Sequence, residues 1–424
     1  MPMLRSPRSQ IAVWTLFDFA NTSFSVLIVT VGFSLYFKEI IVGGGEYGDF
    51  LWGVTVSISM FLTAAISPVL GAASDYSHRK KQFLFVFTVV SILCTAMMYF
   101  LQAGMIAWAM VLFILANIGF EGGLVFYDAF LPGLTTEKSY GRVSGYGFAM
   151  GYVGSLATLL IAMPLYQSGF ISSNLPSIRF SFVIAALFFL VFSMPLFLFL
   201  LDRSRNDGKG LSYVREGLHR VNDTVKHLRH YRNVARFLLA FFLYNDGILS
   251  VIAFSSLFAR TSLNFSLQEV LAFFAVVQTT AILGSVLFGV LTDHYGPKRT
   301  ITLSLLIWCA IVIGAYFTTS KTFFYVIGLF AGACLGGTQS ASRSFMAQLT
   351  PKEREAEFFG FYDGLCGKAS AVIGTFLFGF ISYLTGSERF AVVSIGLFFL
   401  IGLLLLQRVK EHEPYEENYE KTFT

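Results

Sequence analysis

The stretch that decides the fold is GAASDYSHRK at residues 71–80, because it recurs as GVLTDHYGPKR at residues 289–299. In each copy an Asp follows a Gly by four residues, and paired basic residues follow the Asp, at the end of a long apolar run. Gly lets membrane helices approach closely. The Asp then caps a helix or neutralises charge at the water boundary, and the basic pair cannot enter hydrocarbon. A charged surface turn would explain either copy alone. Repetition at matching places instead predicts two related halves, each with a short charged connection between spanning helices.

The composition excludes a soluble domain. The 424 residues are 55% hydrophobic, 17% aromatic and 13% charged, and the mean hydropathy is +0.68. So little polar surface means that lipid must solvate much of the chain, and the 48 Phe residues fit a lipid-facing exterior. The net charge of +5 does not indicate a nucleic-acid partner, because the basic residues lie in the gaps between apolar runs.

Apolar runs of spanning length predict twelve membrane helices, six on each side of a polar stretch. We therefore expect an all-α membrane protein with two pseudo-symmetric six-helix bundles, 1–201 and 237–407, a cytoplasmic linker at 202–236 and a cytoplasmic tail at 408–424. The predicted spans are 11–37, 51–73, 83–101, 105–131, 144–168, 179–201, 235–260, 268–291, 300–318, 322–346, 359–384 and 389–407.

The linker is rich in Arg and Lys. Its segment SYVREGLHRVNDTVKHLRH at 212–230 is either an amphipathic helix on the membrane surface, with Leu218, Val221, Val225 and Leu228 on one face, or a solvated charged linker. Basic residues concentrate in the gaps on the side of the N-terminus, which predicts that both termini are cytoplasmic. The opposite gaps carry isolated ones such as Lys38, Arg179, Arg260, Lys321 and Arg389.

A second repeat lies further along each half. AFLPGLTTEK at 129–138 and GYGFAMGYVGS at 145–155 align without gaps with SFMAQLTPKE at 344–353 and GFYDGLCGKAS at 360–370. Parallel six-helix repeats imply a binding site at the interface between the halves, near mid-membrane.

The sequence carries no nucleotide-binding loop, metal-ligand cluster or nucleophile motif. The four Cys residues lie in apolar runs without ligand spacing. We therefore expect a protein that is not an enzyme and uses no cofactor or metal, with transport energy drawn from a gradient.

Ionisable residues inside the spans are candidates because of the cost of placing them there. The strongest is Asp246, a proton or substrate-amine site that could load and release a proton as a cavity changes sides; the alternative is a fixed ion pair with Lys368. Lys368 could hold a substrate carboxylate and, with Asp246 or Glu121, would suit a zwitterion. The set of candidate binding residues is Asp18, Asn21, Asn117, Glu121, Asp246, Gln278, Gln339 and Lys368; for the amides, helix-packing hydrogen bonds are the alternative.

A second set is predicted to gate the cytoplasmic side. Asp128 and Arg343 occupy equivalent positions in the repeat, and we expect ion pairs that form when that side is shut and break when it opens. Interfacial anchoring is the alternative, and substrate contact is not expected. The predicted gate residues are Gly71, Asp75, Arg79, Asp128, Gly289, Asp293, Arg299, Arg343 and Asp363.

The motifs resemble the major facilitator superfamily and, within it, the vacuole effluxer-like family. The segments that carry the resemblance are WTLFDFANTSF (14–24), YDAFLP (127–132), GYGFAMGYVG (145–154), DG (246–247), SRSFMAQLTP (342–351) and EFFGFYDGLCGKASAVIG (357–374). The resemblance implies two six-helix bundles with alternating access by rocking. It also implies a link to amino acids, because fungal members are associated with amino-acid efflux from the vacuole.

We therefore expect a secondary transporter of a small polar solute, with an amino acid as the best candidate and protons as the coupling ion through Asp246 with Glu121 or Asp18. Efflux is one possible direction, and a monomer in a bacterial inner membrane is the expected setting. The alternative within transporters is an exporter or uniporter of an amphipathic drug, a lipid-like molecule, a sugar or a nucleoside; an apolar cavity would favour the drug or lipid. A receptor would need a sizeable output domain, which is absent from the sequence.

Overall fold

The computed structural model describes residues 6–201, 212–227, 229–385 and 388–411. Part of the predicted linker (202–211 and Leu228) and most of the predicted tail (412–424) lie outside the described residues. Eleven helices in the described part are long and apolar enough to cross a membrane, and a shorter apolar helix, Phe376–Thr385, belongs to a twelfth crossing. The prediction of an all-α fold with twelve membrane helices is thus confirmed.

The first half contains six membrane helices. The first crossing runs through α1 (Pro7–Phe24), the π-helical turn η2 (Ser25–Thr30), α2 (Gly32–Tyr36) and the π-helical turn η3 (Phe37–Ile41). The other five are α3 (Gly45–Ser77), α4 (Lys80–Met97), α5 (Ile106–Asp128), α7 (Tyr140–Tyr166) and α8 (Leu175–Phe199), with α6 (Leu131–Leu134) between α5 and α7.

The second half repeats this plan, with one crossing broken. Five of its helices are α10 (Arg232–Leu263), α11 (Leu267–Tyr295), α12 (Pro297–Phe317), α13 (Lys321–Leu349) and α16 (Glu388–Gln407). The remaining crossing consists of the π-helical segment η6 (Gly360–Gly367) and α15 (Ala371–Thr385), and α14 (Glu355–Phe359) leads into it from outside the membrane. This broken helix carries Lys368, so its irregular backbone lies beside a candidate binding residue.

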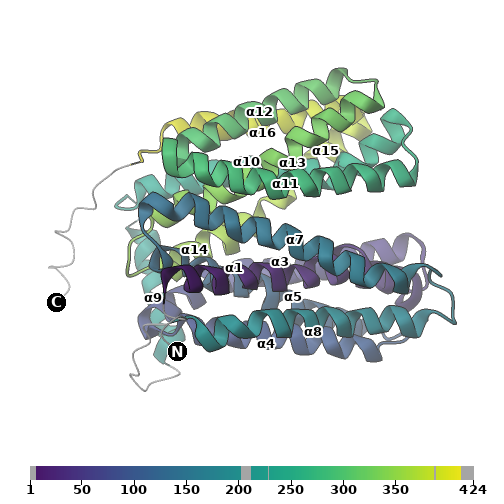
Figure 1. Ribbon diagram of the computed structural model, residues 1–424, viewed down its shortest axis with the longest axis horizontal. Coiled ribbons are helices and arrows are strands. Elements are labelled where there is room, and N and C mark those ends of the chain that lie inside the picture. Colours follow the sequence, from purple (N-terminus) through teal and green to yellow (C-terminus); the bar gives the residue numbers. More distant parts are fainter. Residues whose placement is uncertain (1–5, 202–211, 228, 386–387, 412–424) are drawn as a thin grey trace.

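The two halves lie side by side with their helices roughly parallel (Figure 1). α9 (Ser212–Lys226) lies at the end where α1 begins and α16 ends. The same end carries Lys80 and Lys298 in the first turns of α4 and α12 and Arg354 just before α14, and we call it the basic end. α10 begins at Arg232, four residues before the expected end of the linker.

Large apolar side chains cover the outside of both halves. Phe61, Phe317 and Phe376 are each more than 70% exposed, an arrangement that suits a lipid solvent and would be unfavourable in water. The halves lie in close contact at the two predicted glycines near the basic end. A Cβ on Gly71 would lie 2.1 Å from the carbonyl oxygen of Ala356, and one on Gly289 would lie 2.7 Å from that of Gly141.

Candidate functional site

Asp75 binds the start of the broken helix of the other half. Its carboxylate accepts hydrogen bonds from the backbone N–H groups of Ala356 (3.1 Å) and Glu357 (2.8 Å) in α14. The Lys80 ammonium lies 3.4 Å from Asp75 and also pairs with Glu355. A carboxylate at a helix N-terminus satisfies amides that have no partner within the helix and complements the helix dipole. Asp75 thereby joins the two halves.

Asp293 does the same in the opposite direction. Its carboxylate accepts from the backbone N–H groups of Gly141 (2.8 Å) and Arg142 (3.2 Å) at the start of α7, and from Nε of Arg142 (2.6 Å). Each copy of the repeated motif therefore caps a helix of the other half, which explains why an Asp must follow the close-packing Gly by about one turn. The capping role that the spacing suggested is thus present, and it acts between the halves.

Arg343, deeper in the molecule, joins three helices of the first half. From α13 its Nη1 donates to Asp128 Oδ1 (2.8 Å) and lies 3.4 Å from Asp18 Oδ2. Its Nε and Nη2 donate to the side-chain and backbone oxygens of Ser144 (3.0 and 2.8 Å). Asp128 and Arg343, expected at equivalent gate positions, therefore meet directly. We call Arg343, Asp128 and Asp18 the arginine cluster.

Three aromatic rings surround the Arg343 guanidinium. Its carbon lies 4.1 Å from the Phe148 ring centre, 4.9 Å from that of Trp14 and 5.8 Å from that of Tyr127. The Trp14 and Tyr127 rings stack at 4.6 Å, and the Tyr127 hydroxyl donates to Asp18 Oδ2 (2.7 Å). Cation–π contacts and bidentate donors hold Arg in ways that Lys would not reproduce. Arg343 is only 2% exposed.

A second buried cluster lies nearer mid-membrane and also joins the halves. The Lys368 ammonium is 2.5 Å from Glu121 Oε2 on α5 and 3.6 Å from Asp363 Oδ1 on its own broken helix. Within the described part of the chain, the other carboxylate oxygen of Asp363 is buried without a hydrogen-bond partner. We call these three residues the lysine cluster. Asp363 was expected at the basic-end gate, but its contact is with Lys368, about two turns further along the broken helix than the α14 start that Asp75 binds.

Asp246 accepts hydrogen bonds from the start of α15, just after the break in this helix. Both of its carboxylate oxygens accept from the backbone N–H of Gly374 (2.9 Å each), in the first turn of α15. The neighbouring Asn245 Nδ2 donates to Ser370 Oγ (2.8 Å). The alternative of an Asp246–Lys368 ion pair is wrong, because Lys368 points to Glu121 while Asp246, which is 0% exposed, is occupied by the helix terminus.

The remaining polar candidates separate into different places. Asn21 Nδ2 lies 3.4 Å from Asp18 Oδ1, so it belongs to the arginine cluster. Gln339 accepts from the Tyr152 hydroxyl across the interface (2.7 Å). Asn117 donates to Ser59 within the first half (2.9 Å), the helix-packing role given as the alternative for the amides.

Two predicted gate residues, Arg79 and Arg299, lie near side chains of α9 and of the second half, respectively. The Arg79 guanidinium carbon lies 5.5 Å from the ring centre of Tyr213 in α9. Arg299 is exposed and lines a groove with Gln407 and Glu411 of its own half. The water boundary accounts for the basic character of both residues. A basic residue at that boundary need not lie between the halves.

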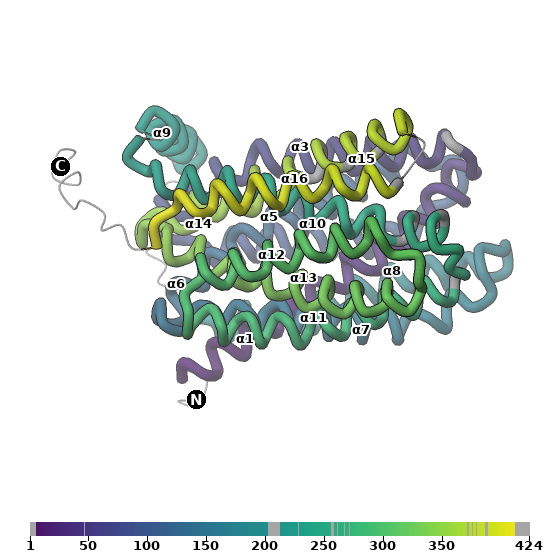
Figure 2. The backbone as a smooth tube through the Cα atoms, turned by 90° about the horizontal axis from the view of Figure 1, so that it is seen from above, coloured from purple at the N-terminus to yellow at the C-terminus, as the bar shows by residue number. Residues whose placement is uncertain are grey.

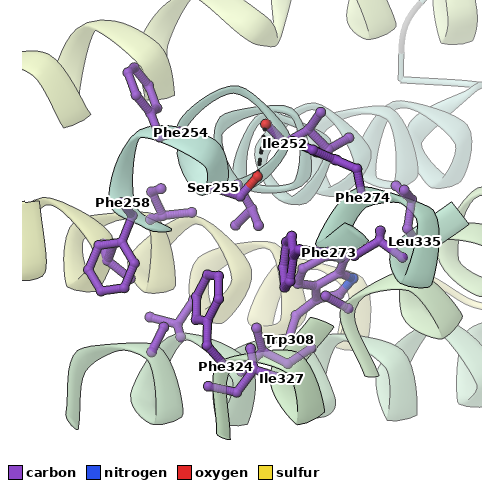
Figure 3. Close-up of a pocket in the computed structure, with 18 of the residues that line it drawn as sticks. Ile252, Phe254, Ser255, Phe258, Phe273, Phe274, Trp308, Phe324, Ile327 and Leu335 are labelled. Carbon is purple, nitrogen blue, oxygen red and sulfur yellow. Dashed lines mark hydrogen bonds between the residues drawn. The ribbon is translucent and has the colours of Figure 1, made fainter. Parts of the chain in front are cut away.

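The second half also contains a partly open apolar pocket of about 130 Å³ (Figure 3). Phe258, Phe273, Phe324 and Trp308 border it, and Gln278 is one of its few polar neighbours. Gln278 is thus separated from the clusters between the halves, and the sequence offered no signal for this because its helix is apolar on every side.

Sequence reasoning missed several residues that the clusters use. Trp14, Tyr127, Ser144 and Phe148 are neutral, so the search for ionisable residues within spans passed over them. The signal was nonetheless present, because all four fall in or beside the quoted segments 14–24, 127–132 and 145–154.

With this geometry in view, the comparisons with known proteins identify the family. Residues 52–418 match the family model described as "Vacuole effluxer Atg22 like". The chain belongs to this family. An "Uncharacterized MFS-type transporter YxiO" of Bacillus subtilis is 31% identical over 94% of each chain. "Autophagy-related protein 22" of Coccidioides immitis is 24% identical over 83% of this chain and 70% of the fungal one.

Solved structures agree on the fold. A proton:xylose symporter of the major facilitator superfamily superimposes with a TM-score of 0.73 at 16% identity, covering 95% of each chain. The human organic anion transporter MFSD10 gives 0.75 at 15% identity, over 95% of this chain and 100% of that one. This member of the vacuole effluxer Atg22 like family is therefore a major facilitator transporter and not an enzyme.

Proposed function

We propose that the protein is a secondary active transporter that moves an amino acid by proton-coupled alternating access. The observation that carries the proposal is the Glu121–Lys368 pair. It lies near mid-membrane, is buried, and takes one partner from each half. A substrate bound there would contact both halves, as alternating access requires.

The chemistry of the lysine cluster suits a zwitterion. A substrate carboxylate would take Glu121's place beside Lys368, and a substrate ammonium would take Lys368's place beside Glu121 or Asp363. Breaking a buried ion pair without replacement is costly, because it leaves unpaired charge in a medium of low dielectric. A ligand that carries both charges supplies both replacements, whereas a neutral solute supplies neither.

Proton coupling is supported by the number of charges. Each cluster holds one cation and two carboxylates. Each therefore carries one excess negative charge, which the binding of one proton would neutralise. Asp246 is a further candidate, because protonation would weaken its cap on α15 and free the helix segment next to Lys368. Among the structural neighbours, the xylose transporter is named as a proton symporter.

Several of the predicted gate residues lie where the two halves meet at the basic end, as expected for a gate that is shut. Asp75, Asp293 and the arginine cluster all bridge the halves from that end inward, and we propose that they separate when it opens, with Gly71 and Gly289 at close contacts between the helices. The distribution of basic residues supports a cytoplasmic location for this end. The state described here would then face outward.

The direction of transport and the membrane are proposed from the family and one relative. The family description "Vacuole effluxer" supports export, and the Bacillus subtilis relative supports a bacterial inner membrane. We propose a monomer, since both clusters are completed within one chain.

The test is uptake by purified protein in liposomes, with a panel of labelled amino acids and an imposed pH gradient. We expect gradient-stimulated uptake of at least one amino acid, and weaker competition by the amide of that amino acid, which lacks the carboxylate. Lack of uptake of the whole panel, in vesicles shown to contain folded protein, would overturn the amino-acid assignment and leave the transporter fold intact.

The pocket in Figure 3 favours a second candidate, an exporter of an amphipathic or lipid-like molecule. Its lining is almost entirely aromatic and aliphatic, as in ligand pockets that take apolar molecules. Competition of such compounds with amino-acid uptake, or their own transport in the same vesicles, would support it.

A further inference from the structure

α9 is a helix with three distinct faces, and the membrane helices account for only one of them. Tyr213, Gly217 and Thr224 are buried, and a Cβ on Gly217 would lie 2.5 Å from the carbonyl oxygen of Val69 in α3. Thr224 donates to Glu357 of α14. α9 therefore contacts α3 of the first half and α14 of the second half along one edge.

The next face of α9 is apolar and exposed. Val214, Leu218 and Val225 are 46%, 55% and 54% exposed. At 3.6 residues per turn these side chains and Val221 fall within an arc of about 60°. Four aliphatic residues on one side of a short, charged helix are a poor match for water, and they mark a surface that contacts something apolar.

The contacts of α9 define which way this apolar face points. Tyr213 and Arg220 lie against Tyr76, in the last turn of α3 at the basic end. Gly217 lies against Val69 and Ala73, one to two turns further into α3. Around the α9 axis the order is Arg220, Tyr213, Thr224, Gly217 and then the apolar arc. Continuing past Gly217 therefore moves away from the end of α3 and toward the centre of the membrane.

The orientation of α9 fits this placement. In Figure 2 the membrane helices run across the view, whereas α9 at the basic end is seen nearly along its axis. α9 thus lies across the direction of the spans, in the plane that a membrane surface would occupy, and at the outer edge of the bundle beside α3.

Basic residues flank the apolar arc on the side away from α3. Arg215 and Lys226 are exposed and lie about 90° round the helix from the centre of the arc. Arg229 and Arg232, which follow α9, are exposed as well. Long basic side chains beside a shallow apolar face can reach phosphate groups while their stems stay in the interface.

We propose that α9 is an interfacial helix that inserts its Val214, Leu218 and Val225 face into the bilayer at the basic end and holds anionic lipid headgroups with Arg215 and Lys226. Because the same helix binds α3 and α14, the lipid surface would bear directly on the contact between the halves. The occupant is an anionic bilayer, because the apolar arc points toward the centre of the membrane and the basic arc adjoins it on the side away from α3.

The test uses full-length protein in nanodiscs, with a single environment-sensitive fluorophore on α9. In L218C and V225C we expect emission quenched by lipid-chain nitroxides and shielded from iodide, more strongly as phosphatidylglycerol is added. H219C is the matched control, because position 219 lies on the exposed polar arc one residue away. Unsubstituted protein corrects for labelling of the four native Cys residues.

The basic arc is tested separately. In L218C carrying R215Q and K226Q, the dependence of quenching on phosphatidylglycerol should be lost, with protein yield and folding unchanged because both side chains are exposed. Inorganic phosphate added to protein in detergent should not reproduce the spectral shift. Equal access of iodide to positions 218 and 219, or the same quenching in neutral and anionic nanodiscs, would overturn the proposal.

Discussion

The arginine and lysine clusters have the same composition, one cation and two carboxylates shared between the halves, but they differ in how the cation is held. Arg343 donates to Asp128 and twice to Ser144, lies beside Asp18, and is enclosed by three rings. Lys368 has two carboxylate neighbours, one of them at 3.6 Å, and lies just before the turn that breaks its helix.

This difference suits the two clusters to different roles. A guanidinium with many fixed partners stabilises one arrangement of the helices, and it is released only when all partners move together. An ammonium is a point charge that accepts a new partner in many geometries. The arginine cluster is thus suited to holding the basic end shut, and the lysine cluster to exchanging one ionic partner for another.

The largest effect is expected from R343Q. R343Q removes the buried cation that pairs with Asp18 and Asp128. Removing one partner of such a buried pair lowers the free energy of unfolding by about 3–5 kcal/mol. Thermal unfolding in detergent should show a large loss of stability, and transport should be lost. R299Q is the control, because Arg299 is exposed. A stable R343Q protein with normal transport would contradict the role of the arginine cluster in holding the basic end shut.

K368A should change substrate selectivity in addition to lowering stability, because it too leaves two carboxylates, Glu121 and Asp363, without their cation. We expect the affinity for a carboxylate-bearing substrate to fall by about 2 kcal/mol or more, roughly 30-fold, because its ionic partner is gone. The discrimination between an amino acid and its amide should disappear. K321A is the matched control, since Lys321 pairs with Glu269 and is 42% exposed at the far end of the second half. Equal losses for acid and amide in K368A would show a structural lysine.

D246N separates capping from coupling. Asn caps a helix about as well as Asp, so substrate exchange without a gradient should persist while gradient-driven transport is lost. The measurement compares counterflow with pH-driven uptake in the same vesicles. Gradient-driven uptake with unchanged pH dependence in D246N would show that Asp246 caps α15 and does not couple transport to protons.

The smallest effect concerns α9 and pH. Burial raises the pKa of Glu357 above its ordinary 4.5 while α9 covers it, although Thr224 and Arg354 oppose the shift. A raised pKa means that docking of α9 is strongest below the ordinary value and weakens as pH rises through the raised one. Hydrogen exchange in 212–226, corrected for its intrinsic pH dependence, should increase over that window.

E357Q should flatten this profile, and D223N should leave it unchanged, because Asp223 pairs with His219 on the outer side of α9. An identical profile in wild type and E357Q would assign the pH response to another group.

Much of the fold followed from the sequence by itself. Long apolar runs can satisfy their backbone polar groups in lipid only as helices, so length and hydropathy determined the spans. The repeated motif determined the two halves. Its Gly and Asp spacing also indicated a close approach and a cap, because those roles depend on the properties of the residues themselves.

Partners across the interface were decided only by the tertiary structure. The cost of burial singled out Asp18, Glu121, Asp246 and Lys368, but it could not say that Lys368 meets Glu121 while Asp246 caps α15. Pairing depends on helix rotation and on the break after Lys368, which arise from packing between segments more than 100 residues apart. A sequence states which charges must be satisfied within the membrane; only the packed helices determine which groups satisfy them.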